Sequence, residues 1–274
     1  ILDPDRKKMS KSKGNVVVPN EILETHGSDA VRYWAASARL GTDAAFDEGQ
    51  MKIGRRLAIK LLNAARFALS FELPAGVTAV TEAIDKSMLA SLQEVIVGST
   101  QAFESYDHTK ALEKAESFFW TFTDDYLELV EERAYGQGDF TEQEKGSAVI
   151  ALRQALGVLV RLFAPFIPFA AEEVWSWWQD GTVHKSSWPT PDEISGEDSG
   201  LMIFASAALV QIRKSKSDNK LSMKAEIATA LVSGPVAMRS MAKDLAAVGH
   251  IAELRFADAK EVTVTELRFL PNQD

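Results

Sequence analysis

The sequence has 274 residues, of which 46% are hydrophobic, and its 30 basic and 39 acidic side chains give a net charge of −9. This length accommodates two domains, and the hydrophobic share excludes an intrinsically disordered chain. The acidic balance argues against a protein coated in nucleic acid, but not against a local basic face.

The composition also argues against a metal site and a membrane protein. Cysteine is absent, so disulfides and thiolate metal ligands are excluded. The histidines lie far apart without metal-ligand spacing, and no protein-bound metal is expected; they are His26, His108, His184 and His250. No apolar run approaches the ~20 residues that span a bilayer, and the first residues do not form a signal peptide. We expect a soluble, cytoplasmic protein.

The first element in chain order is the run KMSKSKGN at residues 8–15. Lysine and serine side chains donate hydrogen bonds to phosphate, and Gly14 lets the backbone approach a bound group. The run is therefore typical of a phosphate-binding loop. A solvated surface loop is the alternative for a lysine-serine run considered by itself.

Amphipathic helices follow this loop. Ser28 can cap a helix through residues 30–40 that Gly41 ends. A longer helix is predicted over residues 53–71, where Leu73-Pro74-Ala75-Gly76 breaks it. Its apolar face consists of Ile53, Leu57, Leu61, Ala64 and Ala68.

Helical patterns continue through the middle of the chain. We expect one helix over residues 84–106 and two within 109–135, around a break near 123–125. The acid-rich run 124–133 is interpreted as a helix face that buries its leucines, rather than as paired catalytic carboxylates. Thr141 and Glu144 have capping-box spacing and open the next helix. The apolar stripe of that helix is Leu152, Leu156, Leu159 and Phe163, before Pro165 and Pro168 stop it.

A short aromatic helix over residues 168–178 closes the helical part. Its tryptophans could stack on bases, but core packing is the favoured interpretation; they are Trp175, Trp177 and Trp178. Residues 181–200 are rich in Ser, Gly, Pro and acid and predict a linker. A helix over 201–212, a basic loop over 213–224, strands over 227–233, 251–257 and 261–269, and a helix over 235–249 follow.

Two basic segments are candidate RNA surfaces. On the helix from residue 53, one side carries Arg55, Arg56, Lys60, Asn63 and Arg66 with the ring of Phe67. Arginine can donate two hydrogen bonds to one phosphate, and an unstacked base can stack on an aromatic ring. The loop of residues 213–220 adds Arg213, Lys214, Lys216 and Lys220, which suit phosphate contacts. Solvated surfaces with ion pairs between helices remain the alternative for both.

The run KMSKSKGN, followed by VVVPNEILETHGSDAVRYW, resembles the class I aminoacyl-tRNA synthetases. A chance match to the core KMSKS is expected in about one such chain in ten thousand. The stretches KIGRRLAIKLLNAARF and IRKSKSDNKLSMK point to the valyl-tRNA synthetases, and PFAAEEVW and SSWP resemble the end of that family's anticodon-binding bundle. The resemblance covers nearly the whole chain.

The resemblance implies an ATP-dependent ligase that activates valine and transfers it to tRNA(Val), with Mg²⁺-bound ATP as the nucleotide. It assigns the grip on the ATP phosphates to the loop: Lys11 would stabilise the departing pyrophosphate, Lys8 would assist, and Ser10 and Ser12 would donate hydrogen bonds. It also implies a monomer with no membrane partner.

The resemblance further implies the domain organisation. We expect a catalytic-domain remnant over residues 1–50, a helical anticodon-binding domain over 51–195 and a small α/β subdomain over 200–274. The family's histidine signature, nucleotide-binding sheet and editing domain have no counterpart here, and the chain begins at Ile1. We therefore expect the C-terminal part of a longer enzyme, inactive by itself, in which the family's C-terminal coiled-coil arm is cut off or absent. An isoleucyl- or leucyl-tRNA synthetase fragment, a non-catalytic RNA-binding module and a helical scaffold are the alternatives.

Overall fold

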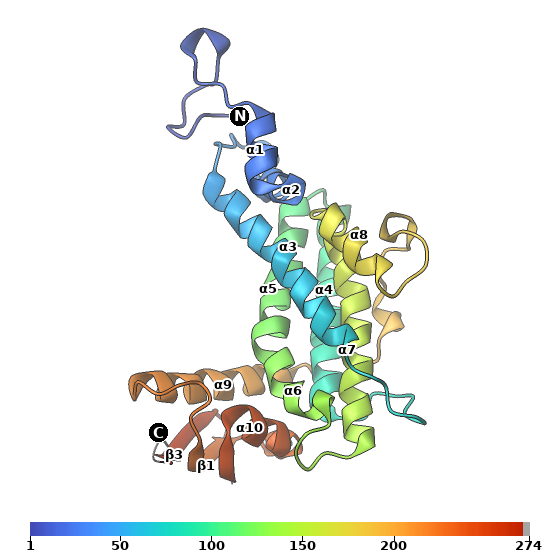
Figure 1. Cartoon of the computed structure of the whole chain (residues 1–274), viewed down its shortest axis with the longest axis vertical. Coiled ribbons are helices and arrows are strands. Elements are labelled where there is room, and N and C mark those ends of the chain that lie inside the picture. The colour runs from blue at the N-terminus through green and yellow to red at the C-terminus, as the bar shows by residue number, and fades with distance from the viewer. Residues whose placement is uncertain (271–274) are drawn as a thin grey trace. The chain divides into compact units, whose positions relative to one another are not determined.

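A computed structural model describes residues 1–270 (Figure 1). The chain folds into two compact units. The first unit comprises residues 1–70, 94–117 and 155–193, and the second comprises 71–93, 118–154 and the chain from 194 onward. The helices α4 (Ala83–Glu104), α5 (His108–Thr121) and α7 (Glu142–Phe163) contribute residues to both units. The predicted fold class, mainly helical with a small C-terminal α/β part, is confirmed.

The longest helix of the first unit is α3 (Glu48–Leu69). It was predicted from residue 53 and begins earlier because Asp47 caps it: the Asp47 carboxylate accepts the N–H groups of Gly49 at 2.8 Å and Gln50 at 3.2 Å. The buried face of α3 includes Leu57, Leu61, Ala64 and Ala68, as the periodicity predicts. This face packs against α2 (Ser28–Ser37) and α8 (Pro168–Ser176) (Figure 1).

The predicted helix from Ser28 to Gly41 is wrong at both ends. A separate helix, α1 (Pro19–His26), precedes it, and Gly27, with φ of 86°, separates the two. Ser28 is the first residue of α2 and its side chain caps nothing. α2 ends at Ser37, where the Thr109 hydroxyl donates to the carbonyl oxygens of Ala36 at 3.2 Å and Ala38 at 3.4 Å. These contacts supply partners for carbonyls that a longer helix would have satisfied.

Three short 3₁₀ turns complete the first unit: η1 (Lys11–Lys13), η3 (Val183–Lys185) and η4 (Pro191–Glu193). The two latter turns lie in the segment predicted as a linker. Trp188 anchors this segment, because its Nε1 donates to Thr100 Oγ1 at 2.9 Å and its ring meets that of Phe103 at 5.3 Å.

The break predicted near residues 123–125 is a π-helical turn, η2 (Phe122–Tyr126), that leads directly into α6 (Leu127–Tyr135). One extra residue in the turn keeps aromatic rings in line along the buried side. The ring of Phe122 stacks with Phe118 at 6.3 Å and with Tyr126 at 5.8 Å. Gly136, with φ of 69°, ends α6 in the left-handed conformation that favours glycine.

The capping box predicted at the start of α7 is confirmed. The backbone N–H of Thr141 donates to Glu144 Oε2 at 2.7 Å, and the Glu144 N–H donates to Thr141 Oγ1 at 3.2 Å. The predicted stripe from Leu152 to Phe163 is buried. α7 is long and apolar enough to cross a membrane, but 72% of its apolar window is buried inside the structure, as in the core helix of a globular protein.

The basic loop predicted over residues 213–224 is wrong in its first half, because α9 (Gly200–Asp218) continues through Arg213, Lys214 and Lys216. Beyond it, a three-stranded sheet has β1 (Ile227–Gly234) at its centre. β2 (Ile251–Asp258) pairs with β1 in parallel and β3 (Thr263–Phe269) pairs antiparallel. The connection from β1 to β2 runs through η5 (Val236–Met241) and α10 (Ala242–Gly249), as a parallel crossover requires.

Candidate functional site

Asn15 closes the loop of residues 8–15 at its base. Its Nδ2 donates to Asp3 Oδ2 at 2.7 Å, and its Oδ1 accepts the N–H of Ser10 at 2.9 Å. Asp3, which is 7% exposed, also accepts the N–H of Lys7 through Oδ1 at 2.7 Å. The hydrogen bond from Asn15, with that from Lys7, holds the pKa of the Asp3 carboxyl below its ordinary value. This Asp3–Asn15 clasp fixes the two ends of the loop against each other, and the sequence analysis missed it.

The tip of the loop presents cations to solvent. η1 turns the chain, and Gly14 takes a left-handed φ of 66° while its N–H donates to the Lys11 carbonyl at 3.2 Å. The hydroxyls of Ser10 and Ser12 lie 3.3 Å apart. Lys8 and Lys11 are exposed, and neither forms an ion pair within residues 1–270. A clasped base with free ammonium groups at the tip suits the capture of a multiply charged anion.

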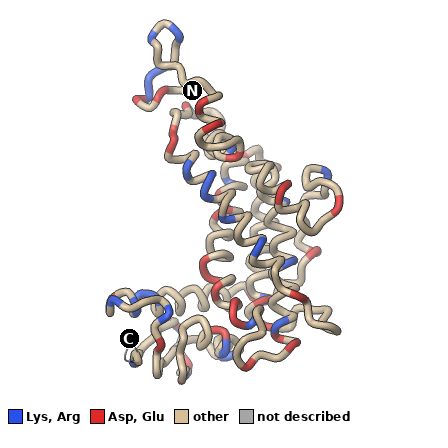
Figure 2. The backbone as a smooth tube through the Cα atoms, viewed as in Figure 1, with Lys and Arg blue, Asp and Glu red and all other residues tan. Residues whose placement is uncertain are grey.

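The predicted basic face of α3 exists as a run of Lys and Arg along the helix (Figure 2). Arg55, Arg56, Asn63 and Arg66 are exposed, whereas Lys60 and Phe67 are half-buried. Arg55 Nη1 donates to the carbonyl of Thr25 at 2.8 Å, which ties its guanidinium to α1.

The tryptophans in and just after α8 do not pack in the core as predicted, because Trp175, Trp177 and Trp178 are all half-buried at the surface. The guanidinium of Arg66 lies 5.5 Å from the ring centre of Trp177, which is a cation–π contact. Trp177 Nε1 donates to Glu173 Oε1 at 3.1 Å, and the rings of Trp175 and Trp178 lie 5.8 Å apart. Trp177 therefore supports the basic face of α3 near the C-terminal end of that helix.

The second basic segment divides into exposed and internal cations. Lys214 and Lys220 are exposed. Arg213 instead pairs with Asp125 and Glu128, with each N–O distance 2.7 Å. These acids hold Arg213 against η2 and α6, and their charges help to raise the pKa of its guanidinium despite partial burial.

Lys216 is 1% exposed and has no carboxylate partner among residues 1–270. Its ammonium donates to the carbonyl oxygens of Met223 at 2.7 Å and Gly249 at 2.9 Å. Gly249 is the last residue of α10, where the helix dipole favours a cation. Burial lowers the pKa of Lys216. Lys216 thus joins the turn after α9 to the end of α10.

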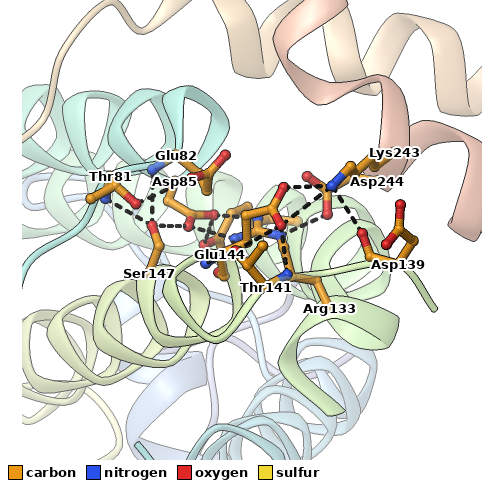
Figure 3. Close-up of polar contacts among 11 residues, drawn as sticks. Thr81, Glu82, Asp85, Arg133, Asp139, Thr141, Glu144, Ser147, Lys243 and Asp244 are labelled. Carbon is orange, nitrogen blue, oxygen red and sulfur yellow. Dashed lines mark hydrogen bonds and ion pairs between the residues drawn. The ribbon is translucent and has the colours of Figure 1, made fainter. Parts of the chain in front are cut away.

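A buried polar cluster in the second unit was not predicted (Figure 3). In the second unit, Arg133 is 1% exposed and forms ion pairs with Asp85 at 2.7 Å and Asp244 at 2.8 Å. Asp85 also accepts the hydroxyls of Tyr126 at 2.8 Å and Ser147 at 2.6 Å. The cluster joins α4, α6, α7 and α10.

A helical-spacing signal could have revealed this cluster. Leu129 and Val130 mark the buried side of α6, and Arg133 follows at the spacing of the same face. Asp85 likewise lies between the buried Ile84 and Met88. Among residues 1–270, no group of three or more His, Cys, Asp or Glu side chains is arranged to hold a metal ion.

Comparison with known proteins identifies relatives of this chain. The family described as the anticodon-binding domain of tRNA ligase matches residues 85–231, more than half of the chain. A second family, the class I tRNA synthetases (I, L, M and V), matches residues 1–47.

The curated relatives include proteins named valine–tRNA ligase. The protein of Thermobifida fusca is 57% identical over 93% of this chain and 30% of its own length. The protein of Leifsonia xyli subsp. xyli is 53% identical over 97% of this chain and 32% of its own length. The chain therefore spans about a third of the length of these relatives.

A solved structure shares the fold. It is Agrobacterium radiobacter LeuRS in a ternary complex with tRNA and LeuAMS, which matches 72% of this chain and 24% of its own chain, with a TM-score of 0.52. At 23% identity, this likeness concerns the fold alone. The family match to residues 85–231 and the helical bundle agree with each other. The chain belongs to the family of anticodon-binding domains of tRNA ligases.

Proposed function

We propose that this chain is part of a valine–tRNA ligase and supplies its ATP-phosphate loop and a tRNA-binding surface. The observation that carries the proposal is the clasped KMSKS loop, which exposes Lys8 and Lys11, on a chain that is 57% identical to a valine–tRNA ligase. The loop would bind Mg²⁺-bound ATP. We also propose that the protein acts as a monomer in the cytoplasm.

The loop lysines would act on the phosphates. Negative charge on the pyrophosphate grows as it departs, so a fixed cation stabilises the transition state more than the ground state. Lys11 is our candidate for this role, with Lys8 beside it and Ser10 and Ser12 as hydrogen-bond donors. The Asp3–Asn15 clasp would hold these groups in one arrangement before ATP arrives, which reduces the entropy lost on binding.

For tRNA(Val), the proposed contacts lie on two surfaces. On α3 they are Arg55, Arg56, Lys60, Asn63, Arg66 and Phe67. At the end of α9 and just after it they are Lys214 and Lys220, because Arg213 and Lys216 are engaged with groups of the second unit. The net charge of −9 opposes diffuse attraction to RNA, so these local cations must supply it.

The catalytic part of the proposal is testable in a chimaera, in which this chain replaces the matching 30% of the Thermobifida fusca protein. We expect valine-dependent exchange of pyrophosphate into ATP and charging of a tRNA(Val) transcript. Lys11→Ala should lower kcat for exchange by about 10²-fold, the effect of losing one donor to developing charge. A folded chimaera without exchange, or a Lys11→Ala variant with unchanged kcat, contradicts the proposal.

A further inference from the structure

A pocket of about 330 Å³ lies in the first unit between the α1–α2 junction, α3 and the start of α8. The residues that matter in its lining are His26, Arg55, Ile59, Phe169 and Glu173. Two large apolar side chains are exposed to solvent here: Phe169 is 65% exposed and Ile59 is 48% exposed. Apolar groups left exposed around a hollow mark a binding surface.

The aromatic ring stands on a rigid support. Pro168 opens α8, and the buried carboxylate of Asp29 accepts the N–H of Phe169 at 3.1 Å and that of Ala170 at 2.7 Å. Asp29 thereby satisfies the N-terminal donors of α8. The backbone that carries the Phe169 ring is fixed before any ligand binds, so little conformational entropy is lost when the ring is covered.

Charge around the pocket selects the kind of ligand. Arg55 lines it, and its guanidinium is held by the hydrogen bond to Thr25. Lys52 and Arg56 lie on the exposed side of the same helix. An exposed ring beside a fixed arginine is complementary to an unstacked nucleobase with a flanking phosphate.

Glu173 adds a criterion for the base. Its Oε1 accepts the Trp177 Nε1 at 3.1 Å, and a carboxylate can accept further hydrogen bonds but cannot donate. It therefore pairs with the exocyclic amino group of cytosine, adenine or guanine, and it repels the carbonyl oxygen that uracil has in place of the cytosine amino group.

We propose that the pocket of Arg55, Ile59, Phe169 and Glu173 receives an unstacked nucleobase of the bound tRNA, one that carries an exocyclic amino group. Phe169 supplies the stacking surface, Arg55 contacts a flanking phosphate, and Glu173 accepts the amino group. This inference rests on the proposed binding of tRNA.

The test is a fluorescence titration of this 274-residue chain with a tRNA(Val) transcript. Phe169→Ala should raise Kd by about 5- to 150-fold, the effect of losing one stacked base, while Phe169→Tyr should bind like the parent. Tyr106→Ala is the matched control, because Tyr106 is an aromatic that is 84% exposed in the first unit and lies outside the pocket. Since Phe169 is exposed, its replacement should leave the melting temperature unchanged.

The base criterion is tested with the ribo-octamers rC8 and rU8. We expect rC8 to bind more tightly than rU8, and Glu173→Gln to abolish the difference, because glutamine can both donate and accept. Equal affinity of the parent chain for the two octamers overturns the role of Glu173. A parent chain that binds tRNA(Val) while Phe169→Ala binds equally well overturns the pocket alone, whereas a chain that binds no tRNA contradicts the proposed function itself.

Discussion

Arg133 and Asp85 form a two-point ion pair inside the second unit. Nη1 of Arg133 donates to Asp85 Oδ2 at 2.9 Å, and Nη2 donates to Oδ1 at 2.7 Å. The two side chains are 1% and 0% exposed. Because Asp244 accepts from Nε of the same guanidinium at 2.8 Å, one cation serves two buried carboxylates. Removal of the cation would leave both carboxylates buried without a counter-charge.

We therefore expect Arg133→Met to lower the free energy of unfolding by about 3–5 kcal/mol, the range for breaking a buried ion pair from one side. Arg255→Met is the control, because its pair with Glu266 at 2.7 Å is about half exposed. That variant should lose less than about 1 kcal/mol. Urea unfolding followed by circular dichroism measures the free energy of unfolding of both variants. Equal losses in the two variants would show that burial does not increase the contribution of the Arg133 pair to stability.

The Asp244 carboxyl predicts an unusual pH dependence of stability. Burial raises its pKa from the ordinary 3.8 to about 6, although Arg133 opposes the shift. The folded chain then binds a proton more tightly than the unfolded chain, so this group makes the free energy of unfolding rise as pH falls from about 7 to 4, by up to about 3 kcal/mol.

Asp244→Asn should remove that contribution and leave the other titrating groups in place. Burial lowers the pKa of His250 and so gives the opposite slope near pH 6, but this effect is common to both proteins and cancels in the comparison. Urea unfolding at pH 5, 6 and 7 measures the two slopes. The same slope in both proteins would mean that Asp244 does not titrate in this range.

The Asp3–Asn15 clasp predicts a catalytic effect without contact to ATP. In the chimaera, Asn15→Ala should lower kcat/KM for ATP in pyrophosphate exchange by about tenfold, because a hydrogen bond to a charged group is worth about 1.5–3 kcal/mol. Asn15 positions the loop and lies outside the helical core, so the variant should keep the circular dichroism spectrum of the parent protein. Glu21→Gln, on the exposed surface of α1, is the control and should have no effect. Unchanged kinetics in Asn15→Ala would show that the loop orders itself without the clasp.

The arginines of α3 can be sorted by salt dependence. Replacing an arginine that holds only phosphate with alanine should weaken the binding of all tRNAs alike. It should also reduce the slope of log affinity against log salt concentration by about one. Replacing an arginine that contacts a base should reduce the binding free energy by about 1–3 kcal/mol and weaken the preference for tRNA(Val) over an anticodon-swapped transcript. Fluorescence titration at two salt concentrations compares Arg55→Ala, Arg56→Ala and Arg66→Ala. Arg39→Ala, outside α3, is the control, and parent-like binding by all three variants would mean that RNA contacts another surface.

Lys216 and Lys214 provide a contrast within one helix. Lys216→Met should lower the free energy of unfolding by about 1–3 kcal/mol, because the carbonyls of Met223 and Gly249 lose their buried donor. Lys214→Met, at an exposed position, should change it by less than about 0.5 kcal/mol and should instead weaken tRNA binding. Thermal melts and RNA titrations of both variants measure the two effects. A loss of stability in Lys214→Met together with a loss of tRNA binding in Lys216→Met would contradict this assignment.

Much of the fold could be predicted because it depends on local patterns. The apolar stripe of α3, the Thr141–Glu144 capping box and the three strands all follow from periodicity or spacing. The end of α2 could not be predicted, because it depends on a hydrogen bond from Thr109, far along the chain.

The basic side chains show more clearly that contacts between distant parts of the chain could not be predicted from the sequence. Lys214 and Lys216 are neighbours in a basic run, yet one is exposed and the other is buried. The difference comes from the carbonyl of Gly249, which only the folded second unit brings to Lys216. The lysines at the loop tip were predictable as exposed, whereas the clasp beneath them required a contact between Asp3 and Asn15.

The π-helical turn η2 holds one residue more than a regular helical turn. Deletion of one residue between Phe122 and Tyr126 would therefore restore a regular helix and keep α6 on its present face, so that Arg133 would still meet Asp85 and Leu129 would stay buried. The same deletion within α6 would instead rotate the residues after it by about 100°. Among relatives, a gap of one residue should therefore be found more readily within η2 than within α6.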